Sequence, residues 1–148
     1  MRNIATMCIA LLMACAGFGL SGGASFAAQE AAPAVSSDYV QAYYFHATRR
    51  CATCIKLEQY SRGSIETNFK DQLKSATLRF NEVNFDEPEN RHFLQDYKLT
   101  YRALVIVRYK DGKQVTYKNL EKIWQLVRSE QEFSDYVKTE VDAMLKEL

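Results

Sequence analysis

The chain has 148 residues, four cysteines and a formal net charge of +1. This length fits one domain with a buried core. The near balance of charge excludes the strongly basic surface with which proteins bind nucleic acids or anionic membranes, so we expect neither partner.

Residues 1–27 have the pattern of an export signal. Arg2 supplies a positive start, and the apolar run over residues 4–16 is too short to span a bilayer comfortably. Ser25-Phe26-Ala27 fits a small-x-small cleavage site, so we expect cleavage after Ala27. The protein is then periplasmic or otherwise exported, with no membrane span after cleavage.

A lipoprotein signal is the alternative for this segment. Leu12-Met13-Ala14-Cys15 resembles a bacterial lipobox and would place a lipid anchor on Cys15. An uncleaved membrane anchor is disfavoured, because the glycines over residues 17–23 interrupt the apolar run.

Cleavage changes both the charge and the cysteine count of the mature chain. Losing Arg2 leaves equal numbers of basic and acidic residues, and Cys51 and Cys54 become the last two cysteines. An even number of cysteines in an exported protein indicates that they are oxidised to a disulfide. A bridge over so short a loop adds little stability, so a functional pair is the better interpretation.

Residues 28–37 are rich in Ala and Ser and predict a flexible linker, and residues 38–148 form the predicted domain. The domain opens with a strand over residues 38–45, and apolar residues on both parities predict burial of both its faces. Residues 46–50 are a loop, and a helical pattern begins at Cys51.

Cys51 and Cys54 lie one helical turn apart, on the same face of that predicted helix. Their sulfurs can then meet in a disulfide, with Cα atoms within about 7 Å. The free N–H groups of the helix start, together with Arg49 and Arg50, favour a thiolate at Cys51. We therefore expect a redox pair in which Cys51 is the nucleophile.

The helix continues past a predicted kink or break at Gly63, and a second strand follows over residues 77–85. The apolar residues of that strand change parity, which indicates a bulge or late burial on both faces. Asp86 is expected to cap a short helix that has Pro88 early in its first turn.

The third strand is the continuous apolar run over residues 103–107, which predicts burial on both faces. Asp111-Gly112 predicts a tight hairpin to a fourth strand. One or two helical turns follow around Trp124, which we expect to be a packing residue. A capping box at residues 129–132 opens the final helix.

The order β-α-β-α-β-β-α, with Cys51-Ala52-Thr53-Cys54 directly after the first strand, resembles the thioredoxin superfamily over residues 38–148. The resemblance implies an α/β fold with a mixed four-stranded sheet flanked by helices. It also implies a thiol–disulfide oxidoreductase that acts through Cys51 and Cys54, without a cofactor, on protein or small-molecule disulfides. An upstream redox partner and a monomeric state follow from the same resemblance.

Three features of that family are missing here. The Trp that often precedes its first cysteine is Arg50, the buried Asp late in its first strand has no counterpart, and its cis-proline is absent. Its members usually carry a cis-proline just before the third strand, whereas this chain has prolines at positions 33 and 88 only. Residues 100–104 should therefore contain trans peptide bonds. Tyr101 and Arg102 should occupy the space beside the disulfide, where Arg102 adds a positive charge that favours the thiolate.

Two other functions are compatible with the pattern. Cys51, Cys54 and His46 are a set of ligands for copper or zinc, which suits a metal-binding module. The cysteines can also serve as a local clip in a non-catalytic interaction domain. Three roles are open for His46: a strand-end histidine bonded to the backbone, a proton shuttle that tunes Cys51, or a third metal ligand.

Overall fold

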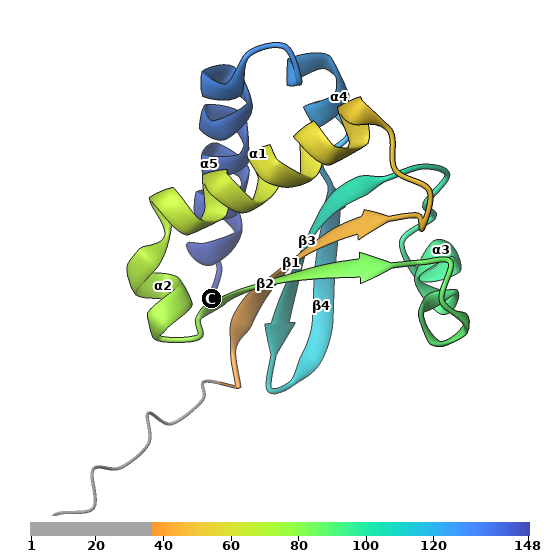
Figure 1. Ribbon diagram of the computed structural model, residues 1–148. Helices are drawn as coiled ribbons and strands as arrows, with labels where there is room; N and C mark the ends of the chain where they lie inside the picture. The colour runs from red at the N-terminus through yellow and green to blue at the C-terminus, as the bar shows by residue number, and fades with distance from the viewer. Residues whose placement is uncertain (1–36) are drawn as a thin grey trace, which may run out of the picture. The chain divides into compact units, whose positions relative to one another are not determined.

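The computed structural model describes residues 37–148, whose centre is a four-stranded sheet (Figure 1). The strands, in chain order, are β1 (Tyr39–His46), β2 (Leu78–Asn84), β3 (Ala103–Lys110) and β4 (Lys113–Asn119). The helices are α1 (Ala52–Asn68), α2 (Lys70–Lys74), α3 (His92–Asp96), α4 (Ile123–Leu126) and α5 (Glu130–Leu145), with a 3-10 turn at Pro88–Asn90.

The sheet is mixed, and its strand order is β2-β1-β3-β4. β1 runs parallel to β2, because the crossover through α1 and α2 returns the chain to the end of the sheet at which β1 begins. β3 is antiparallel to both β1 and β4. The predicted α/β class and mixed four-stranded sheet are therefore confirmed.

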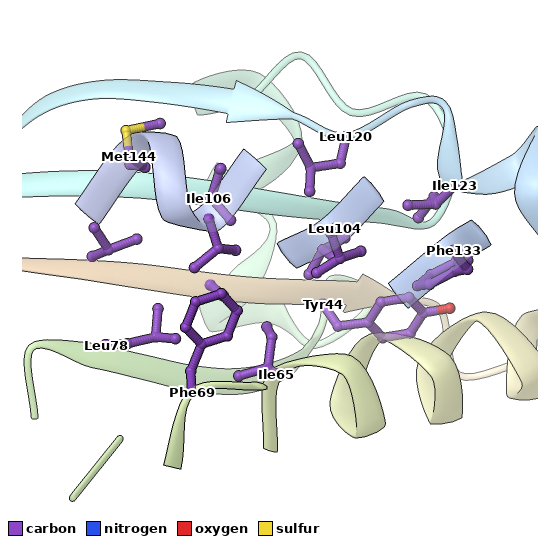
Figure 2. Packing of buried hydrophobic residues seen from close by; sticks show 14 of the residues in the cluster. Tyr44, Ile65, Phe69, Leu78, Leu104, Ile106, Leu120, Ile123, Phe133 and Met144 are labelled. Carbon is purple, nitrogen blue, oxygen red and sulfur yellow. The ribbon is translucent and has the colours of Figure 1, made fainter. Parts of the chain in front are cut away.

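Both faces of β1 are buried, as its double parity predicted. Val40, Ala42 and Tyr44 point to one face, where they meet residues of α1 and α5 in the larger core (Figure 2). Phe45 belongs to the opposite face, where a smaller core forms with residues of β3 and α3. Because β1 is packed against a core on each of its two faces, its position is tightly constrained.

The turn between β3 and β4 has the predicted hairpin geometry. Asp111 and Gly112 both have positive φ angles, 51° and 71°, as a two-residue type I′ turn requires. At the other end of the domain, the Ser129 hydroxyl accepts a hydrogen bond from the Glu132 N–H at 3.3 Å and caps α5. Both local predictions are confirmed.

The predicted break at Gly63 is wrong. α1 continues through Gly63, and the chain breaks instead at Phe69, whose φ and ψ are −130° and 36°. Phe69 is 1% exposed, and its ring enters the larger core at the point where the helix ends (Figure 2). Tertiary burial of an aromatic ring, rather than the low helix propensity of glycine, sets the boundary.

One further expectation needs correction, and the alternatives given for the second strand are resolved in favour of burial on both faces. Asp86 does not cap the short helix, because Glu87 is the N-cap of the 3-10 turn and makes no capping side-chain bond. β2 pairs with β1 in unbroken register, so it contains no bulge. Its change of parity reflects burial on both faces: Phe80 packs on the larger core and Val83 on the smaller one.

The predicted export signal with cleavage after Ala27, the alternative lipid site at Cys15 and most of the 28–37 linker lie outside the described residues. Within residues 37–148, none of the helices is long and apolar enough to cross a bilayer.

The geometry at Gly63 predicts that Gly63→Ala stabilises the protein. A Cβ atom built there has no heavy atom within 4 Å, and the backbone is helical. Alanine should therefore add about 0.5–1 kcal/mol to the free energy of unfolding, because it restricts the unfolded chain and favours helix. Chemical denaturation followed by circular dichroism measures this change.

Gly112→Ala is the matched control for that experiment. It makes the same side-chain change at a position with a φ of 71°, where any Cβ is strained. This variant should be destabilised, so a loss of stability in Gly63→Ala comparable to that in Gly112→Ala would contradict the prediction.

Candidate functional site

Cys51 and Cys54 form a disulfide at the carboxyl end of β1. Their sulfur atoms are 2.02 Å apart and their Cα atoms 5.0 Å apart, which confirms the predicted separation. The two cysteines differ in accessibility, because Cys51 is exposed whereas Cys54 is 1% exposed. A partner molecule can therefore reach the first sulfur but not the second.

The start of α1 is built around Cys51. Cys51 is the N-cap residue, with extended φ and ψ angles of −108° and 163°, and its carbonyl accepts the first helical bond from Ile55 N–H at 3.0 Å. Its Sγ accepts a hydrogen bond from the Cys54 N–H at 3.1 Å. In the reduced protein, this donor and the other free N–H groups of the first turn favour a thiolate at Cys51.

Tyr44 connects β1 to the same helical turn. Its side chain is fully buried, and its hydroxyl donates a 2.9 Å hydrogen bond to the carbonyl of Cys54. Burial raises the pKa of Tyr44 to about 12, although the nearby charges of Arg50 and Arg102 oppose this effect. The phenol therefore stays protonated at neutral pH and remains a donor. The sequence indicated only a core residue at this position.

The guanidinium of Arg50 forms an ion pair with Glu58 on the second turn of α1. The side chains of Arg50 and Glu58 are 29% and 19% exposed, so solvent screens this pair only in part. Sequence reasoning missed Glu58. An ion pair between the residue before a helix and its second turn has no simple spacing rule.

Arg102, predicted to add a positive charge beside the disulfide, contacts the loop that leads to Cys51. Its guanidinium donates a hydrogen bond to the carbonyl of Arg49, two residues before Cys51. Arg102 therefore holds the backbone of the loop as well as contributing a positive charge. The Arg49 side chain is exposed at the same edge.

The loop is fixed on its other side by the end of β2. Asp86 accepts a 2.8 Å hydrogen bond from the Thr48 N–H, and Asn84 donates a 3.0 Å bond to the Thr48 hydroxyl. Asp86, expected to cap a helix, thus stabilises the loop that precedes Cys51. The sequence alone does not reveal this role, because the two segments are far apart in the chain and meet only in the fold.

The segment before β3 faces the same turn without a proline. Cis peptide bonds are absent from the described residues, so the predicted trans geometry of residues 100–104 is confirmed. The Arg102 carbonyl accepts a 3.0 Å hydrogen bond from the indole N–H of Trp124. Tyr101 packs edge-on against Trp124, with ring centroids 5.6 Å apart.

His46 has the backbone contact expected of a strand-end histidine, since its Nδ1 lies 3.1 Å from the Ala47 carbonyl oxygen. Its side chain lines a cavity with residues of β2 and α3, and neither cysteine lines that cavity. Among residues 37–148, no three His, Cys, Asp or Glu side chains gather closely enough to hold a metal ion. His46 therefore does not complete a metal site with the cysteines in this structure.

No family model and no curated protein matches the chain. Among solved structures, it is similar to Fasciola hepatica thioredoxin, with 18% identity and a TM-score of 0.38 over 64% of this chain and 81% of that one. It is also similar to thioredoxin from Trypanosoma brucei brucei, with 16% identity and a TM-score of 0.36 over 68% and 80% of the two chains.

The topology itself defines the class. A sheet of order β2-β1-β3-β4, with β3 and β4 joined by a hairpin and a cysteine pair at the junction of β1 and α1, is a thioredoxin-like fold. The predicted resemblance is therefore confirmed at the level of the fold. The cysteine pair lies at disulfide distance at this junction.

The ion pair at Arg50 predicts that Glu58→Gln lowers the pKa of the Cys51 thiol in the reduced protein. Without its carboxylate partner, the Arg50 charge next to Cys51 is free to stabilise the thiolate. The ultraviolet absorbance of the thiolate, titrated against pH, measures this change. The pH at which the thiol reaches half its maximal reactivity should fall with it.

Glu66→Gln is the control, because it makes the same charge change farther along α1, where Glu66 pairs with Arg62 instead. It should leave the titration of Cys51 unchanged. A Cys51 pKa that is the same in Glu58→Gln and the wild type would remove the electrostatic role of Glu58.

Arg102→Ala is expected to raise the pKa of the Cys51 thiol. The change removes a nearby positive charge and the hydrogen bond that the Arg102 guanidinium donates to the Arg49 carbonyl. Lys110→Ala, at the opposite end of β3, removes the same charge away from the site and should leave the titration unchanged. If Arg102→Ala titrates like the wild type, Arg102 acts only as a backbone brace.

Proposed function

We propose that this protein is an exported thiol–disulfide oxidoreductase that acts through Cys51 and Cys54. The observation that carries the proposal is the asymmetry of the pair: an exposed sulfur at a helix N-terminus is joined to a buried one. A purely structural clip has no need of an accessible sulfur among thiolate-stabilising groups.

In the reducing direction, the Cys51 thiolate attacks one sulfur of a substrate disulfide. A mixed disulfide forms, and the other substrate sulfur leaves as a thiolate that takes up a proton. Cys54 then loses its proton and attacks the Cys51 sulfur, which releases the second substrate thiol. Two electrons pass from the protein dithiol to the substrate, and the Cys51–Cys54 bond is restored.

In the oxidising direction, the same atoms react in reverse order. A substrate thiolate attacks the exposed Cys51 sulfur, and Cys54 is the leaving group. The groups that stabilise a Cys51 thiolate also stabilise the reduced protein, and so make the pair more oxidising. The direction in use depends on the upstream redox partner that reloads the pair.

The surrounding residues support these steps without entering them. Tyr44 holds the Cys54 carbonyl, and Arg102 holds the Arg49 carbonyl, so both ends of the cysteine turn are positioned before a substrate arrives. The proposed site of action outside the cytoplasm rests on the sequence of residues 1–27, whose charge, apolar run and small residues fit an export signal.

Cys51→Ser should abolish the reduction of insulin disulfides, because a serine hydroxyl cannot form the mixed disulfide. Insulin turbidity in the presence of dithiothreitol, measured against a no-protein background, follows this reaction. An unchanged rate in Cys51→Ser would contradict the proposed function.

Cys54→Ser is the matched control, because it removes the buried sulfur and keeps the exposed one. This variant should still form the mixed disulfide but fail to resolve it. Without dithiothreitol, a covalent complex with the substrate should therefore accumulate in Cys54→Ser, visible by non-reducing electrophoresis, and not in the double variant Cys51→Ser/Cys54→Ser.

A further inference from the structure

A groove lies directly beside the two residues that separate the cysteines. Its volume is about 440 Å³. It lies between the start of α1 and α4, which are neighbours in Figure 1. It is lined by Ala52, Thr53 and Lys56 from α1 and by Trp124, Val127 and Arg128 from α4 and the residues after it. The groove therefore lies next to Cys51 in the chain, where it can hold part of a polypeptide that brings a sulfur to that cysteine.

One wall of the groove is aromatic and held in a fixed orientation. The indole N–H of Trp124 is already used by the Arg102 carbonyl, so the ring is left to make apolar contacts. Tyr101 is 44% exposed, and with Trp124 it lines an adjoining apolar hollow of about 410 Å³. Two rings packed edge to face give a rigid surface for an apolar side chain.

The rest of the lining includes two cations that are not neutralised. Arg50, Arg62, Lys118 and Lys138 all pair with carboxylates. Within residues 37–148, neither Lys56 nor Arg128 has a carboxylate partner, and both are exposed.

We propose that this groove binds an extended, acidic segment of a substrate protein, with an apolar or aromatic residue next to the reacting cysteine. The proposal rests on the thiol–disulfide function above and names its class of substrate. The apolar side chain packs on Tyr101 and Trp124, while acidic residues pair with Lys56 and Arg128.

The charge of the groove is local rather than a property of the whole domain. The domain carries nearly equal numbers of basic and acidic residues, so a general attraction for anions does not explain a preference for acidic partners. Two exposed cations at the groove favour acidic segments in two ways: they speed the encounter by long-range attraction, and they form ion pairs at the edge of the groove. Salt weakens both effects.

The test uses the reduced protein and three synthetic peptides with one intramolecular disulfide each. The peptides share the cysteines and a neighbouring phenylalanine, and differ in flanking residues, which are Glu, Gln or Lys. The second-order rate constant for disulfide reduction is measured for each peptide at low and high salt. Hydroxyethyl disulfide, which is neutral and too small to reach across the groove, reports the chemistry alone.

The acidic peptide should react about three- to tenfold faster than the lysine peptide at low salt, as expected for two exposed ion pairs, and salt should narrow this ratio. The double variant K56E/R128E should invert the ratio. K70E/K74E makes the same charge change on α2, away from the groove, and should keep the wild-type ratio.

The aromatic contact is tested separately with Tyr101→Ser, which changes an exposed side chain. The variant should lose rate with the phenylalanine peptides and not with peptides that carry alanine in its place. Equal loss with both sets would overturn the aromatic part of the proposal.

The failures of the two proposals are distinguishable. If the reduced wild type does not reduce hydroxyethyl disulfide and the oxidised wild type does not oxidise a small dithiol, the oxidoreductase function itself is wrong, and the groove proposal falls with it. If hydroxyethyl disulfide is reduced but acidic and basic peptides react equally, or both double variants change the ratio alike, the groove has no role in choosing the substrate.

Discussion

The hydrogen bond from the Tyr44 hydroxyl to the Cys54 carbonyl joins the central strand to the first turn of α1. β1 pairs with a strand on each side and is packed on both faces, so Tyr44 has little freedom to move. The donor of this bond is therefore fixed by the whole sheet. Because the bond is buried, leaving either partner unsatisfied is costly, which ties the geometry of the cysteine turn to the integrity of the core.

The sequence was sufficient for those features that depend on neighbours along the chain. Apolar runs located the buried strands, the Asp111-Gly112 pair located the hairpin, and the Ser129 capping box located α5. The position of the cysteines between a strand and a helix followed from the same local patterns. Each of these signals is decided within a few residues, where sterics and backbone hydrogen bonding dominate.

The remaining features depend on contacts between distant segments. Phe69, rather than Gly63, ends α1, because a core formed by other elements accepts its ring. Asp86 bonds to Thr48 and Trp124 to Arg102, across gaps that no helical or strand period links. A single sequence shows that these side chains can bond but not which partner the fold brings to them, so their roles at the site became visible only in three dimensions.

The closeness of Cys54 to Cys51 has a kinetic consequence under the proposed chemistry. A bound partner is released by attack from a sulfur of the same molecule, held one helical turn away, so this step is unimolecular. Its rate is independent of how much protein is present, and the effective concentration of the attacking thiol far exceeds that of any free thiol in solution. Covalent complexes with partners should therefore be brief, and the protein leaves each partner without help from a third molecule.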